Sequence, residues 1–211
     1  MKILSHRGYW NSNIEKNSIT SFDRSFQLGF GTETDIRDHN GELVISHDIA
    51  TKSSVLFDEF LERIDKCPGK EAITIALNIK ADGLSELIKE KINKVNKLDL
   101  FVFDMSIPDM RTYLECKIPV FTRMSEVEQN PVWIDQSQGV WLDSFESDWY
   151  DIEIVEKILR MGKRVCIVSP ELHKRNYMEL WLRLKKISNE KLLMLCTDYP
   201  ERAKEYFEIK G

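Results

Sequence analysis

The sequence predicts an α/β protein, a single compact TIM-type (β/α)8 barrel over residues 1–211. Apolar runs of strand length alternate with helical segments along the whole chain, which is typical of parallel α/β architecture. Eight strand segments are present, the number that closes such a barrel. The hydrophobic content of 42% supports one sizeable core, and no linker rich in Gly, Pro or Ser divides the chain.

Each predicted strand is a short apolar run that ends in polar residues. The eight ranges are 2–7, 32–37, 73–80, 100–105, 119–124, 139–144, 164–169 and 192–198. The second strand leads into a small hairpin, because Asn40-Gly41 at its end favours a tight turn. Typical barrels of this kind have about 250 residues. At 211 residues, the chain has room for short loops only.

The predicted helices lie between these strands. Their ranges are 18–28, 56–66, 84–97, 107–115, 150–161, 177–187 and 201–207. Several carry apolar residues at the spacing of an outer helix packed on a sheet, for example Leu84, Leu87, Ile88, Ile92 and Val95. The segment 125–138 lacks this periodicity, so we expect the fifth connection to be reduced to little more than a turn.

Composition narrows the classes of function and the compartment. The formal net charge of −5, with basic residues spread along helices, argues against nucleic-acid binding. The N-terminus has no apolar core of a signal peptide, and no run is long enough to span a bilayer, so we expect a cytoplasmic protein. The four cysteines have no Cys-x-x-Cys spacing and are expected to be reduced and mostly buried.

The strand ends carry the candidate functional residues, since barrels of this type bind and react at the C-terminal ends of their strands. Nearly every predicted strand ends in polar or charged side chains, a pattern that a solvent-exposed rim would also show. Their positions are His6-Arg7, Glu33, Asp35, Asn78, Lys80, Asp104, Arg123, Asp143, Ser169 and Thr197-Asp198.

Glu33 and Asp35 stand out within this set. Positions two apart in a strand share a face, and two carboxylates side by side repel unless one is protonated or a cation lies between them. We favour a hard divalent cation over an exposed strand with scattered charge. His6 and His47 each follow an apolar run, which places two acid or base groups beside that cation.

The ordered set of motifs resembles the glycerophosphodiester phosphodiesterase family. It comprises His6-Arg7-Gly8, Asn17-Ser18, Glu33-x-Asp35, Asn40-Gly41 and His47-Asp48. The resemblance covers the first 48 residues closely and recurs at Thr197-Asp198-x-Pro200.

The resemblance implies a hydrolase that acts on a small-molecule phosphodiester, in which His6 and His47 are acid and base. It further implies that Arg7 contacts the phosphate and that Glu33 and Asp35 bind Mg²⁺ or Ca²⁺. In the family a hydroxyl of the substrate is typically the nucleophile, so a cyclic phosphate forms before or instead of hydrolysis.

Asn78 and Lys80 lie two positions apart in the predicted strand, so their side chains share a face. Lys80 would therefore bring a compact positive charge to the strand end where Asn78 lies. An ordinary lysine at a strand end is the alternative.

The sequence departs from the family at two positions. Asn78 stands where the family has an acid that supplies a third metal ligand, so we expect weaker metal binding through the amide oxygen, or recruitment of Asp104. Lys16 stands where the family has an acid before Asn17, which calls into question the polar network behind the site.

Two further functions stay open from the sequence: a weakened or non-catalytic relative that binds a phosphorylated ligand, and a metal-independent phospholipase-C-like lyase. The sequence gives no indication of oligomeric state. His39, at the hairpin tip, is expected to be exposed and non-catalytic, and His173, among charged residues after the seventh strand, is expected in a solvated loop. The aromatic residues Trp141, Trp149, Trp181 and Phe145 are expected to pack on the strands or to line a binding surface.

Overall fold

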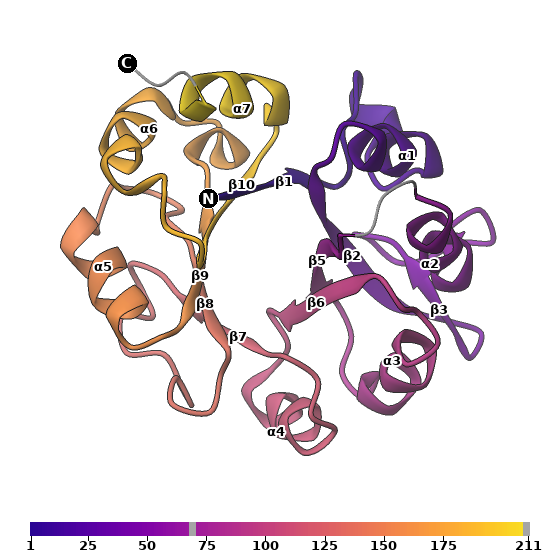
Figure 1. Cartoon of the computed structure of the whole chain (residues 1–211). Helices are drawn as coiled ribbons and strands as arrows, with labels where there is room; N and C mark the ends of the chain where they lie inside the picture. Colours follow the sequence, from indigo (N-terminus) through magenta and orange to yellow (C-terminus); the bar gives the residue numbers. More distant parts are fainter. Residues whose placement is uncertain (68–70, 209–211) are drawn as a thin grey trace. The chain divides into compact units, whose positions relative to one another are not determined.

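The computed structural model describes residues 1–67 and 71–208 and divides into two compact units (Figure 1). The N-terminal unit is Ser5–Val120, and the C-terminal unit is Met1–Leu4 together with Phe121–Gly211. Strand β1 (Lys2–His6) contributes residues to both units. The α/β class is confirmed, whereas barrel closure and a single domain over residues 1–211 stay predictions.

The N-terminal unit has a parallel core of strands with helices on one side (Figure 1). Its elements after β1 are η1 (Asn13–Glu15), α1 (Ile19–Gln27), β2 (Gly31–His39), β3 (Glu42–Ile45), β4 (Val55–Leu56), α2 (Phe57–Lys66), β5 (Ile73–Ile79), α3 (Ser85–Ile92), β6 (Leu98–Phe103) and α4 (Ile107–Glu115). Strands β2, β5 and β6 are parallel, while β2 and β3 form the predicted antiparallel hairpin. Asn40 and Gly41 make its turn with φ of 52° and 85°.

Helices α1 and α2 pack through an aromatic cluster that closes this part of the core. Ser18 caps α1 by accepting a hydrogen bond from the Ser21 N–H, which sets the face that the helix buries. Phe22 of that face meets Phe60 of α2 edge-on, with ring centroids 4.7 Å apart. Both rings are fully buried, so this contact fixes the two helices against each other, and α1 also packs against β2, the strand that carries the two predicted acids.

The C-terminal unit repeats the strand and helix alternation. Its elements are β7 (Phe121–Met124), β8 (Gly139–Leu142), α5 (Ile152–Arg160), β9 (Arg164–Val168), η2 (Pro170–His173), α6 (Met178–Leu184), η3 (Lys185–Ile187), β10 (Leu193–Thr197) and α7 (Pro200–Glu208). The strands are parallel in the order β10, β9, β8, β7, and their core contains the buried Trp181. No helix lies between β7 and β8, all of whose residues are described, which confirms the reduced fifth connection.

The eight predicted strands and seven predicted helices are all present, with shifts at their ends. The largest shift is in α3, which ends at Ile92 instead of residue 97 because Lys94 and Val95 form tighter turns before β6. All four cysteines are free, and all but Cys67 are buried, as expected. Within the described residues, no helix is both long enough and apolar enough to cross a bilayer.

Candidate active site

The turn after β1 positions His6 and Arg7. Arg7 has a left-handed backbone with φ of 58°, and Gly8 follows with φ of 80°. Such a conformation is unusual for a residue with a side chain, and strained residues of this kind cluster at functional sites. The Arg7 N–H donates to the backbone oxygen of Glu33 at 2.9 Å and to its Oε2 at 3.2 Å. The turn is thereby fixed against β2.

Glu33 and Asp35 lie on the same face of β2, and both are buried, with Asp35 fully inaccessible to solvent. Asp35 pairs in register with Asn78 of the neighbouring parallel strand β5. Side chains that pair in register point to the same face of a sheet. The two acids and the Asn78 amide therefore share one face of the β2–β5 pair.

Asp35 is surrounded by donors. Its Oδ2 lies 2.9 Å from the Arg7 Nε and 2.8 Å from the Asn17 Nδ2, while its Oδ1 lies 3.2 Å from the Lys80 Nζ. Burial by itself raises the pKa of this carboxyl, but the two cations and the Asn17 amide outweigh it, so the pKa of Asp35 is lowered. Asp35 is thus ionised at neutral pH.

Glu33 has the opposite electrostatic environment. Burial, followed by repulsion from Asp35, raises the pKa of Glu33 to about 8 against the opposing effect of Arg7 and Lys80. Its Oε2 lies 3.9 Å from the Nε2 of His6. The protein without a bound cation therefore favours one proton on this pair at neutral pH.

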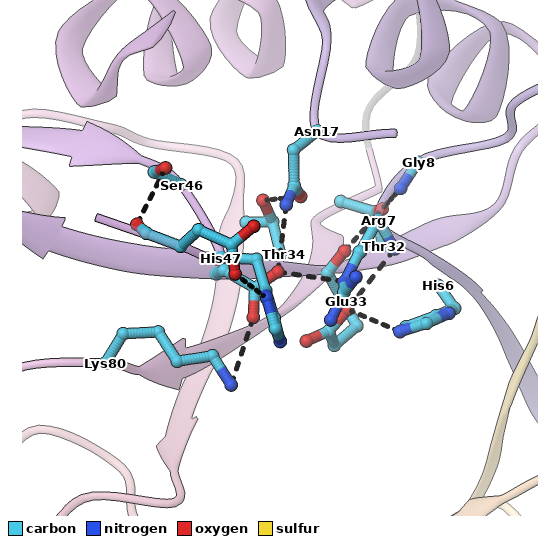
Figure 2. A network of polar contacts seen from close by, with 12 residues as sticks. His6, Arg7, Gly8, Asn17, Thr32, Glu33, Thr34, Ser46, His47 and Lys80 are labelled. Atoms are coloured by element: carbon cyan, nitrogen blue, oxygen red, sulfur yellow. Dashed lines mark hydrogen bonds and ion pairs between the residues drawn. The ribbon is translucent and has the colours of Figure 1, made fainter. Parts of the chain in front are cut away.

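His47 reaches the site from the segment after β3. The Ser46 N–H donates to the backbone oxygen of Asp35 at 3.1 Å, which fixes the start of this segment. The His47 ring is half exposed, and its Nδ1 lies 2.9 Å from the Asp48 carboxylate. Figure 2 shows His47 and Lys80 on one side of Arg7 and Glu33, with the ring of His6 on the other.

The donor set fits a hard divalent cation at Glu33, Asp35 and Asn78. No group of three His, Cys, Asp or Glu side chains is arranged for a metal in the part of the chain that the structure describes. The Asn78 Oδ1 is buried, and no hydrogen-bond partner for it is present among the described residues. An unsatisfied buried oxygen beside two carboxylates is suited to Mg²⁺ or Ca²⁺. Asp104 directly follows β6, and its recruitment as a ligand stays a prediction.

All seven site residues predicted from the sequence lie in the N-terminal unit. The substitution at Lys16 does not break the network behind them: its Nζ lies over the Trp10 ring at 4.3 Å, and Asn17 still reaches Asp35. The sequence did not indicate Thr34, whose hydroxyl donates to the Asn17 Oδ1 at 2.9 Å and orients that amide. A shared pocket for His6 and His47 stays a prediction.

His173 differs from its prediction. It lies in the short helix η2 and not in a solvated loop, and its Nε2 is 2.7 Å from the buried carboxylate of Asp143. The charged neighbours in the sequence concealed this pairing, because Asp143 is 30 residues away along the chain.

No protein-family model matches the sequence, and no curated protein matches it. Solved structures do match. A glycerophosphodiester phosphodiesterase of Agrobacterium tumefaciens superposes with a TM-score of 0.68 at 14% identity, covering 98% of each chain. One from Thermotoga maritima gives a TM-score of 0.66 at 16% identity, covering 96% of this chain and 97% of that chain.

A Ca²⁺-dependent phosphatidylinositol-specific phospholipase C of Streptomyces antibioticus gives a TM-score of 0.61 at 9% identity. It covers 98% of this chain and 95% of that chain. These likenesses extend over nearly the whole length of the chain and agree with the resemblance found in its motifs. The chain therefore has the fold of the glycerophosphodiester phosphodiesterases.

Proposed function

We propose that the protein is a metal-dependent phosphodiesterase that cleaves a glycerophosphodiester or a related small phosphodiester. The observation that carries the proposal is the buried Glu33–Asp35 pair, flanked by the cations of Arg7 and Lys80 and by His6. This pair lies in a chain with the fold of known glycerophosphodiester phosphodiesterases, which supports phosphodiester cleavage as its chemistry. We further propose that residues 1–211 act as one catalytic domain.

Two basic side chains are the proposed phosphate ligands. Arg7 pairs with Asp35 through Nε, so the terminal nitrogens of its guanidinium would face two phosphate oxygens. Lys80 adds a compact charge beside it, and both side chains are partly exposed. Glu33, Asp35 and the Asn78 amide would hold Mg²⁺ or Ca²⁺, which when bound neutralises negative charge on the phosphate.

His6 and His47 are the proposed proton-transfer residues. Cleavage requires that one group take a proton from the attacking hydroxyl and that another give one to the leaving oxygen. An acid lies beside each ring: the Glu33 Oε2 is 3.9 Å from the His6 Nε2, and the Asp48 Oδ1 is 2.9 Å from the His47 Nδ1. If the attacking hydroxyl belongs to the substrate, the first product is a cyclic phosphate, which ³¹P NMR detects.

The proposal is tested by assaying glycerophosphodiesters and bis(p-nitrophenyl) phosphate with Mg²⁺, with Ca²⁺ and with EDTA. We expect His6→Ala and His47→Ala each to lower kcat by about 10²–10⁴-fold, the usual contribution of a proton-transfer group. His39→Ala is the matched control, since this histidine lies at the β2–β3 turn, hydrogen-bonds to Asn40 and is not one of the proposed site residues. Equal activity of all three variants would refute the assigned roles.

A metal-independent lyase is the second candidate, and one observation favours it. Arg7 and Lys80 already hold both carboxylate oxygens of Asp35. In that reaction these cations would neutralise the phosphate without a metal. Full activity in EDTA that still depends on both His6 and His47 would select this candidate. Ligand binding without turnover would select the non-catalytic relative.

A further inference from the structure

The His173–Asp143 pair in the C-terminal unit has the features of a ligand site. Asp143 directly follows β8, and its carboxylate is buried. Its Oδ1 accepts from the Ser144 N–H at 2.8 Å and lies 2.7 Å from the His173 Nε2. These contacts fix the carboxylate, which in turn fixes one nitrogen of the histidine ring.

Helix η2 holds His173 in place from two sides. A 3₁₀-helix has three residues per turn, so Glu171 and His173 point in different directions. Glu171 accepts a hydrogen bond from the Thr197 hydroxyl and, at 3.1 Å, one from the Asp198 N–H at the end of β10. His173 reaches Asp143 at the end of β8. The helix therefore spans from the end of β10 to the end of β8, the two strands that flank β9, and the imidazole is oriented before any ligand arrives.

The loop after β8 places an aromatic ring next to this imidazole. Phe145 is 37% exposed, and its ring centroid lies 4.8 Å from that of His173. The Phe145 N–H donates to the Glu126 carboxylate at 3.1 Å, and Arg175 donates to the Ser144 oxygen at 2.9 Å. An exposed phenyl ring is thus held by a loop that is fixed on both sides.

The second nitrogen of His173 is open. In the neutral ring whose Nε2–H points at Asp143, Nδ1 carries the lone pair, and no other described residue forms a hydrogen bond with it. The side chain is 24% exposed, so a ligand can reach it. One ring nitrogen is thus held by a buried carboxylate, and the other is an accessible acceptor. Such a histidine can accept a hydrogen bond from the hydroxyl group of a ligand.

The surroundings determine which class of ligand fits. The negative charge of Asp143 disfavours an anion, and no metal-binding group of three His, Cys, Asp or Glu side chains lies within residues 1–67 and 71–208. A phenyl ring offers a face on which the C–H side of a polyol packs, while the histidine accepts from its hydroxyl. Neutral polyhydroxylated alcohols match both features.

We propose that His173, Asp143 and Phe145 form a binding site for a neutral polyol, with the His173 Nδ1 accepting a hydroxyl hydrogen bond and the Phe145 ring packing against the carbon skeleton. This site is separate in its residues from the proposed phosphodiesterase site and does not depend on that reaction. It assigns a binding role to the histidine that the proposed reaction does not use.

Histidine NMR tests this site directly. The chain has four histidines, so ring ¹³C and ¹⁵N labelling gives four signals, and His173→Gln assigns one of them. We expect glycerol or myo-inositol to shift the His173 signal with saturation. Asp143→Asn should weaken binding about fivefold or more, the effect of losing roughly one hydrogen bond, and Phe145→Ala should weaken it similarly.

The controls separate this site from the proposed reaction. In the His6→Ala/His47→Ala double variant, which should lack phosphodiesterase activity, the His173 signal should still respond to the polyol. Inorganic phosphate should leave that signal unchanged. The proposal is overturned if the polyol produces no saturable shift of the His173 signal, or if phosphate binds there instead. It is also overturned if folded Asp143→Asn and Phe145→Ala both bind the polyol as tightly as the parent protein does.

Discussion

The protonation of two adjacent acids is the central feature of the site at the residue scale. Glu33 and Asp35 share a buried face, yet only Asp35 is surrounded by cations and an amide donor. Asp35 is therefore ionised despite its burial, whereas burial and then repulsion from Asp35 raise the pKa of Glu33 to about 8. A bound divalent cation would take the place of the proton, because its charge offsets the burial and the repulsion from Asp35 that together raise this pKa.

This asymmetry predicts a pH-dependent stability without metal. The pKa of Glu33 is about 4.5 in the unfolded chain and about 8 in the folded protein. Between these two pH values the folded state therefore binds more protons than the unfolded chain. The stabilisation is complete below about pH 4.5 and is lost as the pH rises through about 8, by at most about 1.4 kcal/mol per pH unit. Urea unfolding in EDTA from pH 5 to 9 measures it.

Glu33→Gln should remove this part of the slope, and saturating Ca²⁺ should do the same in the parent protein. Glu59→Gln, a change at an exposed glutamate of α2, is the control and should keep the slope. A parent protein whose stability rises over this pH range would contradict the assigned protonation of Glu33.

Asn78 is the second residue with a measurable consequence. Asn78→Glu should restore a carboxylate beside Asp35 and tighten Mg²⁺ or Ca²⁺ by about 10- to 100-fold, since ligand charge is a main determinant of such affinities. Asn78→Gln keeps the amide without the charge and is the matched control. Unchanged or weaker affinity in Asn78→Glu, measured by calorimetry, would place position 78 outside the coordination shell.

At the scale of elements, the turn after β1 depends on how closely it approaches α1. A Cβ atom on Gly8 would lie 2.3 Å from the Ser21 Oγ, and the φ of 80° is itself unfavourable for a residue with a side chain. The turn carries His6 and Arg7, so the packing of one helix against one turn positions two functional side chains.

Gly8→Ala should therefore destabilise the protein by about 2–4 kcal/mol, through the steric overlap together with backbone strain. Gly29→Ala is the control: its φ of 78° is similar, but the added Cβ meets no atom within 4 Å. That change should cost only about 1 kcal/mol. Equal losses in urea unfolding would mean that the contact with Ser21 is unimportant.

At the scale of the whole molecule, metal binding should appear as a change in thermal stability. A ligand that binds only the folded state at 100 times its Kd contributes about 2.7 kcal/mol. For a chain of this length we expect Ca²⁺ or Mg²⁺ to raise Tm by about 5–10 °C over the value in EDTA. Asp35→Asn should abolish the shift, whereas Asp38→Asn, an exposed position of the same strand, should preserve it.

By itself the sequence determined the succession of elements and the residue types of the candidate site. Strand and helix periodicities are local, so the strands, the β2–β3 hairpin and the missing fifth helix followed from neighbouring residues. The spacing of Glu33 and Asp35 placed both on one face for the same reason. The shortened end of α3 was missed because tight turns there replace the helical pattern.

Only the tertiary structure decided which side chains meet and what charge they carry. The pKa difference between Glu33 and Asp35 depends on burial and on Lys80, which lies 45 positions beyond Asp35 in the sequence. The same is true of His173, which met Asp143 only when β8 and β9 came together. Residue order fixes local geometry, but desolvation and charge pairing depend on contacts between distant segments.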